Sequence, residues 1–283
     1  MTSTNDTYSH SITPHNSLFD FRLAELWQYR DLVTLFVKRD FVAKYKQTVL
    51  GPVWFFIQPI FQSLVLTVAF GRMAGLPTDG IPPILFYLAG ITAWNYFSNC
   101  LRATSNTFAA NAHLFGKVYF PRVVTPISVV LSNLIQFGIG LLLFLIIYLY
   151  YMLTGSHFHP NNTLFLLPVL ICSMGIMGLG LGMLISSLTT RYRDLQYLVD
   201  FGMQLLMYAT PVIIPLSAIP VKYTPIMLIN PMTGIIETFK YSFFGASIFS
   251  WQLLSYSIGF SISIFLIGFI IFNNTEKNFM DTV

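Results

Sequence analysis

The sequence has 283 residues, of which 55% are apolar, 16% aromatic and only 9% charged. Soluble domains are nearer a quarter charged, so this composition excludes an ordinary soluble protein and indicates an integral membrane protein. The net charge is only +4. The basic residues flank apolar runs instead of forming one patch, which argues against nucleic-acid binding.

The N-terminal part of the chain is polar and then amphipathic. Residues 1–17 lack the basic and apolar regions of a secretory signal, and we expect them to be a disordered cytoplasmic tail. In "SLFDFRLAELWQYRDLVTLFVKRD" apolar residues recur at helical spacing, but the segment is too charged to span a membrane. Residues 18–50 are therefore predicted to form an amphipathic interfacial helix and a basic segment. A helix packed against its own protein is the alternative.

Six apolar segments follow, each long enough for a transmembrane helix, which needs about 20 residues. They lie near 52–71, 83–110, 123–152, 163–189, 195–219 and 251–272. The predicted fold is thus an all-α integral membrane protein with a six-span domain over 51–273 and a cytoplasmic tail over 274–283. The second segment carries Asn95, Ser98, Asn99 and Arg102, so we expect it to be broken or partly shielded from lipid. The fourth, with "GIMGLGLGMLISS", predicts close helix packing through small residues.

The basic residues of the loops predict the orientation of these spans. One side of the predicted membrane holds Arg22, Arg30, Lys38, Arg39, Lys44, Lys46, Lys117, Arg122, Arg191, Arg193 and Lys277. The opposite side holds only Arg72, Lys222 and Lys240. This asymmetry places both termini in the cytoplasm.

Residues 219–247, between the fifth and sixth spans, are apolar but interrupted by proline and glycine. The interruptions predict two short helices, near 222–229 and 232–244. Neither helix is long enough to span, and we expect a re-entrant pair that dips from the outer face. An external loop lying on the membrane is the alternative.

Few residues in the spans carry chemistry. Arg102 and Asp200 are the clear intramembrane ionisable residues, and they either pair with each other or Arg102 extends to the inner surface. A proton relay needs a chain of such groups, so a proton-driven transporter is disfavoured.

Gly116-Lys117 lacks the rest of a nucleotide-binding loop, and His157 with His159 is a weak metal signal. We assign no catalytic or metal site and expect no enzyme activity. Both cysteines, Cys100 and Cys172, lie in apolar runs and are interpreted as small hydrophobic residues.

The turn "RYRD", Arg191 to Asp194, concentrates charge between the fourth and fifth spans. A soluble motor subunit can bind such a turn, because the arginines form charge-assisted hydrogen bonds. Asp194 is expected to cap the following helix.

Three motifs then resemble one family: "LWQYRDLVTLFVKRDFVAKYKQTVLGPVWFFIQP" (26–59), "RYRDL" (191–195) and "NPMTGIIETFKYSFFG" (230–245). From about residue 18 onward the chain is similar to the permeases of bacterial ABC exporters for polysaccharides, in particular the Wzm-like O-antigen group, and also to teichoic-acid and capsule permeases. The resemblance implies a bacterial inner-membrane transporter of two permeases and two ATPase subunits. ATP and Mg are then bound by the ATPase, with no cofactor on this chain. The cargo is a glycan on undecaprenyl diphosphate, which passes through a channel in the permease dimer.

The resemblance also implies three functional regions. Cytoplasmic loops 111–122 and 189–195 are expected to dock into the ATPase through His113, Lys117, Arg191, Tyr192, Arg193 and Asp194. The lipid diphosphate is expected to reach the permease near Arg39, Lys44, Lys46, Leu50 and Gly51. For this basic segment, simple anchoring by anionic lipid is an equal alternative. An outer gate is expected at Asn230, Pro231, Glu237 and Lys240. Glu237 and Lys240 are three apart on one helix and are expected to pair there, either at the gate or merely for solubility.

Sliding glycans are held by aromatic faces, and span two carries a cluster of them. We predict Tyr87, Trp94, Tyr96 and Phe97 as channel residues; packing or lipid contact is the alternative. A drug or small-lipid ABC permease, a membrane glycosyltransferase and a channel without a motor are the competing functions. The glycosyltransferase lacks clustered carboxylates in the cytoplasmic loops.

Overall fold

The computed structural model describes residues 27–279, without 44, 45, 47, 116, 119, 156, 157 and 193, and without the side chains of 277–279. The predicted tail at 1–17 lies outside this range, as do residues 280–283 of the tail predicted at 274–283, whose residues 274–279 belong to α11. Every regular element in the described part is helical. In chain order these elements are α2 (Arg30–Ala43), η1 (Gly51–Val53), α3 (Trp54–Leu66), η2 (Thr67–Met73), α4 (Pro83–Ser105), α5 (Thr107–Phe115), α6 (Val124–Leu153), η3 (Asn162–Leu166), α7 (Leu167–Thr189), α8 (Leu195–Tyr208), η4 (Leu216–Ala218), α9 (Thr224–Ile229), α10 (Pro231–Phe244) and α11 (Trp251–Phe279).

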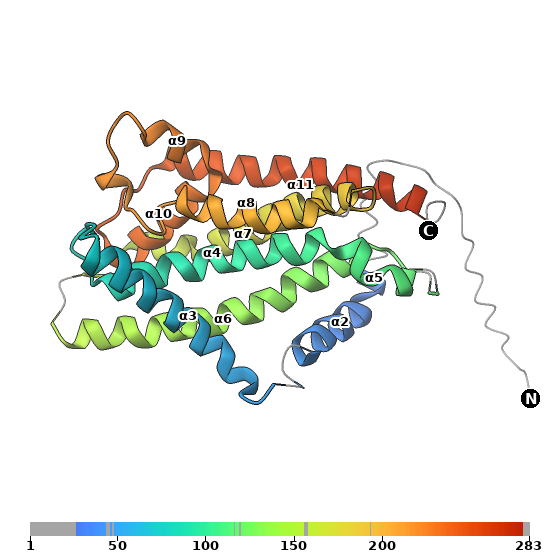
Figure 1. Cartoon of the computed structure of the whole chain (residues 1–283), viewed down its shortest axis with the longest axis horizontal. Helices are drawn as coiled ribbons and strands as arrows, with labels where there is room; N and C mark the ends of the chain where they lie inside the picture. The colour runs from blue at the N-terminus through green and yellow to red at the C-terminus, as the bar shows by residue number, and fades with distance from the viewer. Residues whose placement is uncertain are drawn as a thin grey trace, which may run out of the picture.

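The long helices run along one common axis (Figure 1). One end of the bundle carries α2, α5 and the C-terminal end of α11, and we call it the α5 end. The other end carries α9 and α10, and we call it the α10 end. Within the described residues, four helices are long and apolar enough to cross a membrane: 51–73, 124–153, 162–189 and 251–276.

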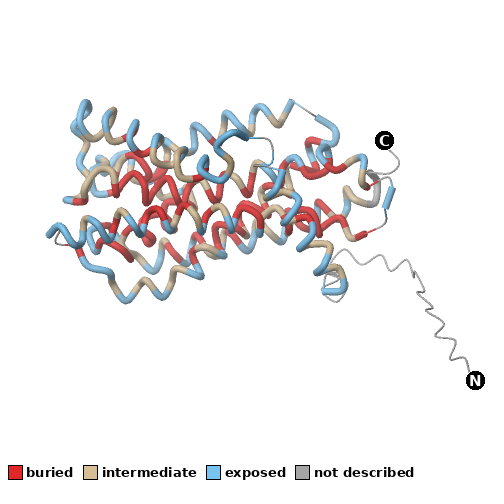
Figure 2. The backbone as a smooth tube through the Cα atoms, turned by 90° about the horizontal axis from the view of Figure 1, so that it is seen from below, coloured by how far each residue is buried: buried red, intermediate tan, exposed pale blue. Residues whose placement is uncertain are grey.

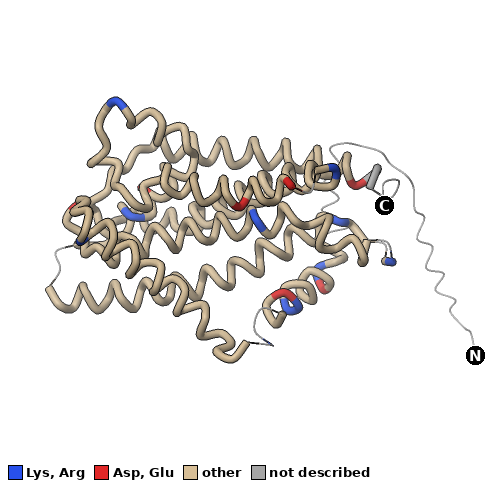
Figure 3. Tube along the Cα trace, in the orientation of Figure 1, with Lys and Arg blue, Asp and Glu red and all other residues tan. Residues whose placement is uncertain are grey.

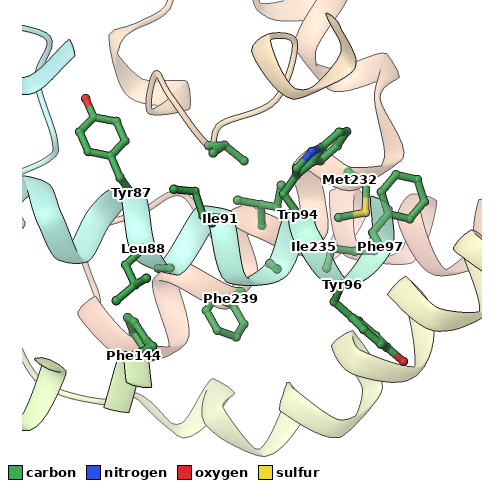
Figure 4. Packing of buried hydrophobic residues seen from close by; sticks show 14 of the residues in the cluster. Tyr87, Leu88, Ile91, Trp94, Tyr96, Phe97, Phe144, Met232, Ile235 and Phe239 are labelled. Carbon is green, nitrogen blue, oxygen red and sulfur yellow. The ribbon is translucent and has the colours of Figure 1, made fainter. Parts of the chain in front are cut away.

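Helix α4 forms the centre of the molecule. Its residues from Leu85 to Ala93 are all buried, and its neighbours are α3, α6, α7, α8 and α10. Buried segments accordingly run along the inside of the bundle, whereas the outer helices expose one side (Figure 2). Tyr87 and Tyr96 leave α4 on opposite sides, while Phe144 of α6 and Phe239 of α10 pack beside it (Figure 4). A helix covered on all sides tolerates polar residues that a lipid-facing helix would not.

The glycines of α7 let two neighbours approach it closely, as the sequence predicts. A Cβ on Gly178 would lie 2.7 Å from Cβ of Cys100 on α4. A Cβ on Gly180 would lie 2.5 Å from Cα of Phe265 on α11, and a Cβ on Gly268 would overlap the carbonyl oxygen of Gly180. Alternate glycines of α7 therefore serve opposite faces of the helix, which fixes α4, α7 and α11 as one packed unit.

The predicted break in the second segment and the two predicted short helices are confirmed, whereas the predicted length of the fifth segment is wrong. The second segment is broken, because α4 ends at Ser105 and α5 begins at Thr107. The two short helices expected in 219–247 are α9 and α10. The fifth segment is not one helix over 195–219: α8 has 14 residues and ends at Tyr208, a length of about 21 Å. Pro211 and Pro215 follow, and proline cannot continue a helix.

Helix α2 packs against the protein. Phe36 is buried, and its ring packs edge-on against that of Phe120, with the two ring centroids 5.7 Å apart. The adjacent Leu35 is exposed. This contact supports the alternative of a helix packed on its own protein, and it leaves an exposed apolar side as well.

Candidate functional site

A polar cavity of about 480 Å³ lies between α3, α4, α6 and α8. Most of its polar lining consists of side-chain amides, and no carboxylate is among the described residues that line it. The polar residues of the lining are Gln58, Gln62, Thr92, Asn95, Ser98, Asn99, Arg102, Asn133, Gln136 and Gln204. Amides both donate and accept hydrogen bonds, so this part of the lining suits groups such as hydroxyls that do the same.

The amides reach the cavity because of their spacing on the helices. Gln58 and Gln62 are one turn apart on α3, and Asn95 and Asn99 are one turn apart on α4, so each pair shares a helix face. Nδ2 of Asn95 donates to Oε1 of Gln62 at 3.2 Å and thereby connects α3 to α4. Sequence analysis singled out the polar residues of span two but missed those of spans one, three and five. An amide repeated at three or four residues within an apolar run is the signal that identifies them.

Arg102 and Asp200 form the ion pair that the sequence allowed. Nε of Arg102 lies 3.3 Å from Oδ1 of Asp200, and its Nη2 donates to the carbonyl oxygen of Asp200 at 3.3 Å. The pair joins α4 to α8 at the wall of the cavity, which Arg102 lines. Both side chains keep considerable exposure, 39% and 53%.

The four aromatic residues predicted for a channel occupy two environments. Trp94 and Tyr96 are buried and line the cavity. Tyr87 and Phe97 are buried in the hydrophobic core and do not line it. Tyr87 and Tyr96 point in different directions because residues nine apart fall on opposite faces of α4 (Figure 4).

Two polar segments predicted as cytoplasmic lie side by side at the α5 end. Oγ1 of Thr189 donates to the carbonyl oxygen of Ser105 at 3.2 Å, and the backbone N–H of Phe108 donates to Oγ of Ser186 at 3.3 Å. The beginning of α5 is thus tied to the end of α7. Charged residues gather at this end of the bundle (Figure 3).

The predicted coupling residues on these two segments are exposed at the α5 end. They are His113, Lys117, Arg191, Tyr192 and Asp194. Arg193 lies outside the described residues. Asp194 occupies the N-cap position of α8, but its carboxylate accepts no hydrogen bond from that helix, so the predicted side-chain cap is wrong.

In the basic segment before α3, Arg39 is held by side-chain contacts, and the turn that follows is exposed. Nη2 of Arg39 lies 2.8 Å from Oδ1 of Asp40, and its guanidinium lies over the Phe36 ring. Lys46, Leu50 and Gly51 are in the turn that leads into η1; Lys46 and Leu50 are exposed, and Gly51 has a φ of +50° that favours glycine. Lys44 lies outside the described residues.

At the α10 end, the residues predicted for an outer gate bind the segment between α8 and α9. Asn230 caps α10, with Oδ1 accepting from the N–H of Met232 at 3.0 Å, and Pro231 is the first residue of that helix. The carboxylate of Glu237 accepts from the N–H of Ile248 at 3.1 Å and from that of Leu216 at 3.5 Å.

The ammonium of Lys240 forms a further contact between α10 and the segment between α8 and α9. It donates to the carbonyl oxygen of Pro211 at 2.5 Å and lies 3.2 Å from the centroid of the Phe86 ring. Both Glu237 and Lys240 are buried. The expected ion pair between them is not formed at contact distance, because each side chain binds backbone from a neighbouring segment instead; the two buried charges still attract each other at longer range.

Known proteins resemble this chain over most of its length. The family model described as ABC-2 type transporter matches residues 31–244. The O-antigen export system permease protein RfbA of Myxococcus xanthus is 30% identical over 222 residues, which cover 78% of this chain and 83% of that protein. The RfbA of Klebsiella pneumoniae is 25% identical over 252 residues, 89% of this chain and 94% of that protein. The polysialic acid transport protein KpsM of Escherichia coli is 24% identical over 245 residues, 84% and 91% of the two chains.

Proposed function

The chain belongs to the ABC-2 type transporter family, and from this we propose that it is the permease of an ATP-driven exporter that moves polysaccharide across the bacterial inner membrane. The cargo in this proposal is a glycan, of the O-antigen kind, attached to undecaprenyl diphosphate. ATP hydrolysis takes place on a separate ATPase subunit. Relatives that export O-antigen or transport polysialic acid support this choice of cargo.

The single observation that carries the proposal is the amide-lined cavity inside the bundle. A glycan presents hydroxyl groups, each of which donates and accepts, as do the amides of the lining. Trp94 and Tyr96 add aromatic surface beside these amides. Carboxylates, which a glycosyltransferase needs to hold a metal-bound nucleotide sugar, are absent from the described lining. The cavity is therefore suited to hold sugar and not to cleave it.

In this proposal the cavity is one half of a channel, and a second copy of the chain supplies the other half. Apolar side chains on both flanks of the cavity are exposed: Phe61 of α3 by 65%, and Tyr197 and Phe201 of α8 by 80% and 60%. Apolar surface of this kind is covered by lipid or by a partner helix. The contact of two copies through α3 and α8 would close the cavity from lipid.

The proposed topology has six membrane passages. They are made by α3 with η2, α4, α6, α7, α11, and α8 continued by the folded-back 209–219 segment. The α5 end faces the cytoplasm, because the basic residues gather there (Figure 3). Helices α9 and α10 are then a re-entrant pair at the outer face, where Asn230, Pro231, Glu237 and Lys240 hold the outer gate.

The proposed ATPase contact is formed by α5 and the α7–α8 turn. The hydrogen bonds of Ser105 with Thr189 and of Phe108 with Ser186 make these two segments one rigid surface. A displacement of either segment would be transmitted to α4 and α8, which both line the cavity. On the membrane side, the basic segment with Arg39, Lys44, Lys46, Leu50 and Gly51 is the proposed access point for the lipid diphosphate.

The test is ATP hydrolysis by the affinity-purified chain in lipid, co-expressed with its genomic neighbours, with and without lipid-linked glycan. We expect an ATPase to co-purify and the glycan to change its rate. An ATPase that ignores glycan would instead favour a drug or small-lipid permease. The triple variant with alanine at Arg191, Arg193 and Asp194 is expected to uncouple the two chains, and normal export by it would exclude the proposed ATPase contact.

A further inference from the structure

Arg102 is the one charged residue in the described lining of two adjoining cavities. The first is the cavity of about 480 Å³, and the second has about 320 Å³. Both are lined by Phe55, Gln58, Asn99, Arg102, Asn133 and Gln136. A guanidinium and four amides from α3, α4 and α6 therefore surround one space. Together they offer many N–H donors, with no carboxylate in the lining.

Asp200 holds the guanidinium of Arg102 only in part. In the described part of the chain, the contacts of Arg102 with Asp200 use Nε and Nη2, both at 3.3 Å. An arginine has five N–H donors, so donors remain for a second acceptor. The distance of 3.3 Å is also long for a charge-assisted bond, whose usual length is about 2.7–2.9 Å.

The helix that carries Asp200 has few contacts within this chain. Of the 14 residues of α8, only Met203 is buried. The helix is short and is followed by an irregular segment, so a movement that takes Asp200 away from Arg102 would break few contacts of α8 within the chain. Arg102, in contrast, stands on the central helix α4, which neighbouring helices enclose.

The shared space also lies directly after the proposed access point. Phe55 and Gln58 belong to the first turns of α3, which begins at Trp54, three residues after Gly51. A ligand that arrives at Leu50 and Gly51 therefore meets Arg102 next. Phe55, which lines both cavities, offers apolar surface for the start of an alkyl chain at the same place.

We propose that Arg102, with the surrounding amides, binds the diphosphate group of the lipid carrier, and that Asp200 is the counter-ion that this diphosphate displaces. The inference rests on the proposed export function and adds an anion site to it. A diphosphate has several charged oxygens in a fixed arrangement, and a guanidinium matches such oxygens with two parallel hydrogen bonds. Gln58 and Asn99 supply further amide donors beside the guanidinium. Without ligand, Asp200 keeps Arg102 from being an uncompensated charge.

The test is binding of radiolabelled undecaprenyl diphosphate to the full transporter, permease with its ATPase, in nanodiscs of neutral lipid. Arg102→Gln keeps N–H donors but removes the charge, and we expect it to weaken binding about tenfold, the loss typical of one charge-assisted hydrogen-bond donor. Asp200→Asn removes the competing counter-ion, and we expect it to tighten binding several-fold. Arg102→Lys is expected to restore part of the affinity. Arg72→Gln, at an exposed arginine on η2 near the α10 end, is the matched control and is expected to bind as the wild type does.

The opposite signs of the two changes separate a binding site from a structural ion pair. A purely structural pair predicts that Arg102→Gln and Asp200→Asn lower the melting temperature alike and shift binding in the same direction, and that result would overturn the inference. Equal displacement of the label by phosphatidylglycerol or by inorganic pyrophosphate would overturn the carrier as the ligand. Glycan-stimulated ATP hydrolysis by the wild type is measured in parallel. If it is present while Arg102→Gln binds the carrier normally, the anion site fails and the export function stands.

Discussion

Nδ2 of Asn230 donates to the carbonyl oxygen of Ala209 at 3.1 Å, and this bond joins the start of α10 to the residue after α8. The same side chain accepts from the N–H of Met232 at 3.0 Å and so caps α10. One amide thus fixes both the helix that lines the cavity and the helix that closes the α10 end. Lys240 also joins α10 to the segment after α8, because it donates to the carbonyl oxygen of Pro211, two residues after Ala209.

The two functions of Asn230 can be separated by substitution. Asn230→Asp retains an oxygen to cap α10 but has no donor for Ala209, whereas Asn230→Ala loses both bonds. We expect Asn230→Ala to cost about 1–2 kcal/mol through the lost cap, and Asn230→Asp to cost less. The measurement is thermal unfolding in detergent. Equal melting temperatures for the two variants would show that the cap adds nothing.

Lys240 is expected to be a strong determinant of stability. Lys240→Met removes the donor to Pro211 and leaves the buried carboxylate of Glu237 without its neighbouring cation. Stranding one buried charge costs about 3 kcal/mol or more, so the melting temperature should fall markedly. Lys222→Met, at an exposed lysine of the same end, is the control and should have no effect. The double variant Glu237→Gln with Lys240→Met should be more stable than Lys240→Met alone, because no charge is then stranded.

The approach of α7 and α11 leaves no room for a methyl group at Gly268. Its Cβ would overlap the carbonyl oxygen of Gly180, a backbone atom that cannot move aside without displacing the helix. We expect Gly268→Ala to destabilise the protein by at least about 1–3 kcal/mol, as overpacking does. Gly259→Ala on the same helix meets nothing within 4 Å and is the matched control. It should be neutral or slightly stabilising, because alanine favours helix over glycine. Yield of folded protein by size-exclusion chromatography checks both.

Arg122 is expected to hold the end of α11 in place. Its Nη1 donates to the carbonyl oxygen of Glu276 at 2.6 Å, and its guanidinium lies 5.4 Å from the centre of the Phe115 ring. Arg122→Gln should weaken the C-terminal turn of α11 by about 1.5–3 kcal/mol, the value of a charge-assisted hydrogen bond. Hydrogen exchange should then become faster in the last turn of α11 and stay unchanged in α10. Arg30→Gln, at an exposed arginine, is the control. Unchanged exchange at the end of α11 would show that other contacts hold it.

Sequence patterns predicted the helices best where local chemistry decides the outcome. The break at Asn106 follows from polar residues in the second span, and α9 and α10 follow from prolines and glycines. The pairing of Arg102 with Asp200 was accessible because two charges in an apolar bundle have few other partners. In each case the deciding residues are close together in sequence or few in number.

The rest depended on contacts between distant segments. The 209–219 segment is apolar enough to suggest a continued helix, yet Pro211 and Pro215 end α8 and the chain folds back against α4 and α10. Its backbone then supplies partners for Asn230, Glu237 and Lys240. Helical spacing of Glu237 and Lys240 suggested that they pair, but spacing alone says nothing of these backbone groups. The amides of the cavity come from four helices, and only the tertiary fold brings them together.

The amide lining has a mechanical consequence for a polymer that moves through it. Each amide offers a donor and an acceptor, and each sugar ring offers several hydroxyls that are both. In the proposed exporter, a hydrogen bond that breaks when the polymer advances by one ring can be replaced by one of the same kind with the next ring. The energy of the polymer would then vary little along the path, with no single strong binding position. A small conformational change at the α5 end would suffice to advance the polymer by one ring, whatever its total length.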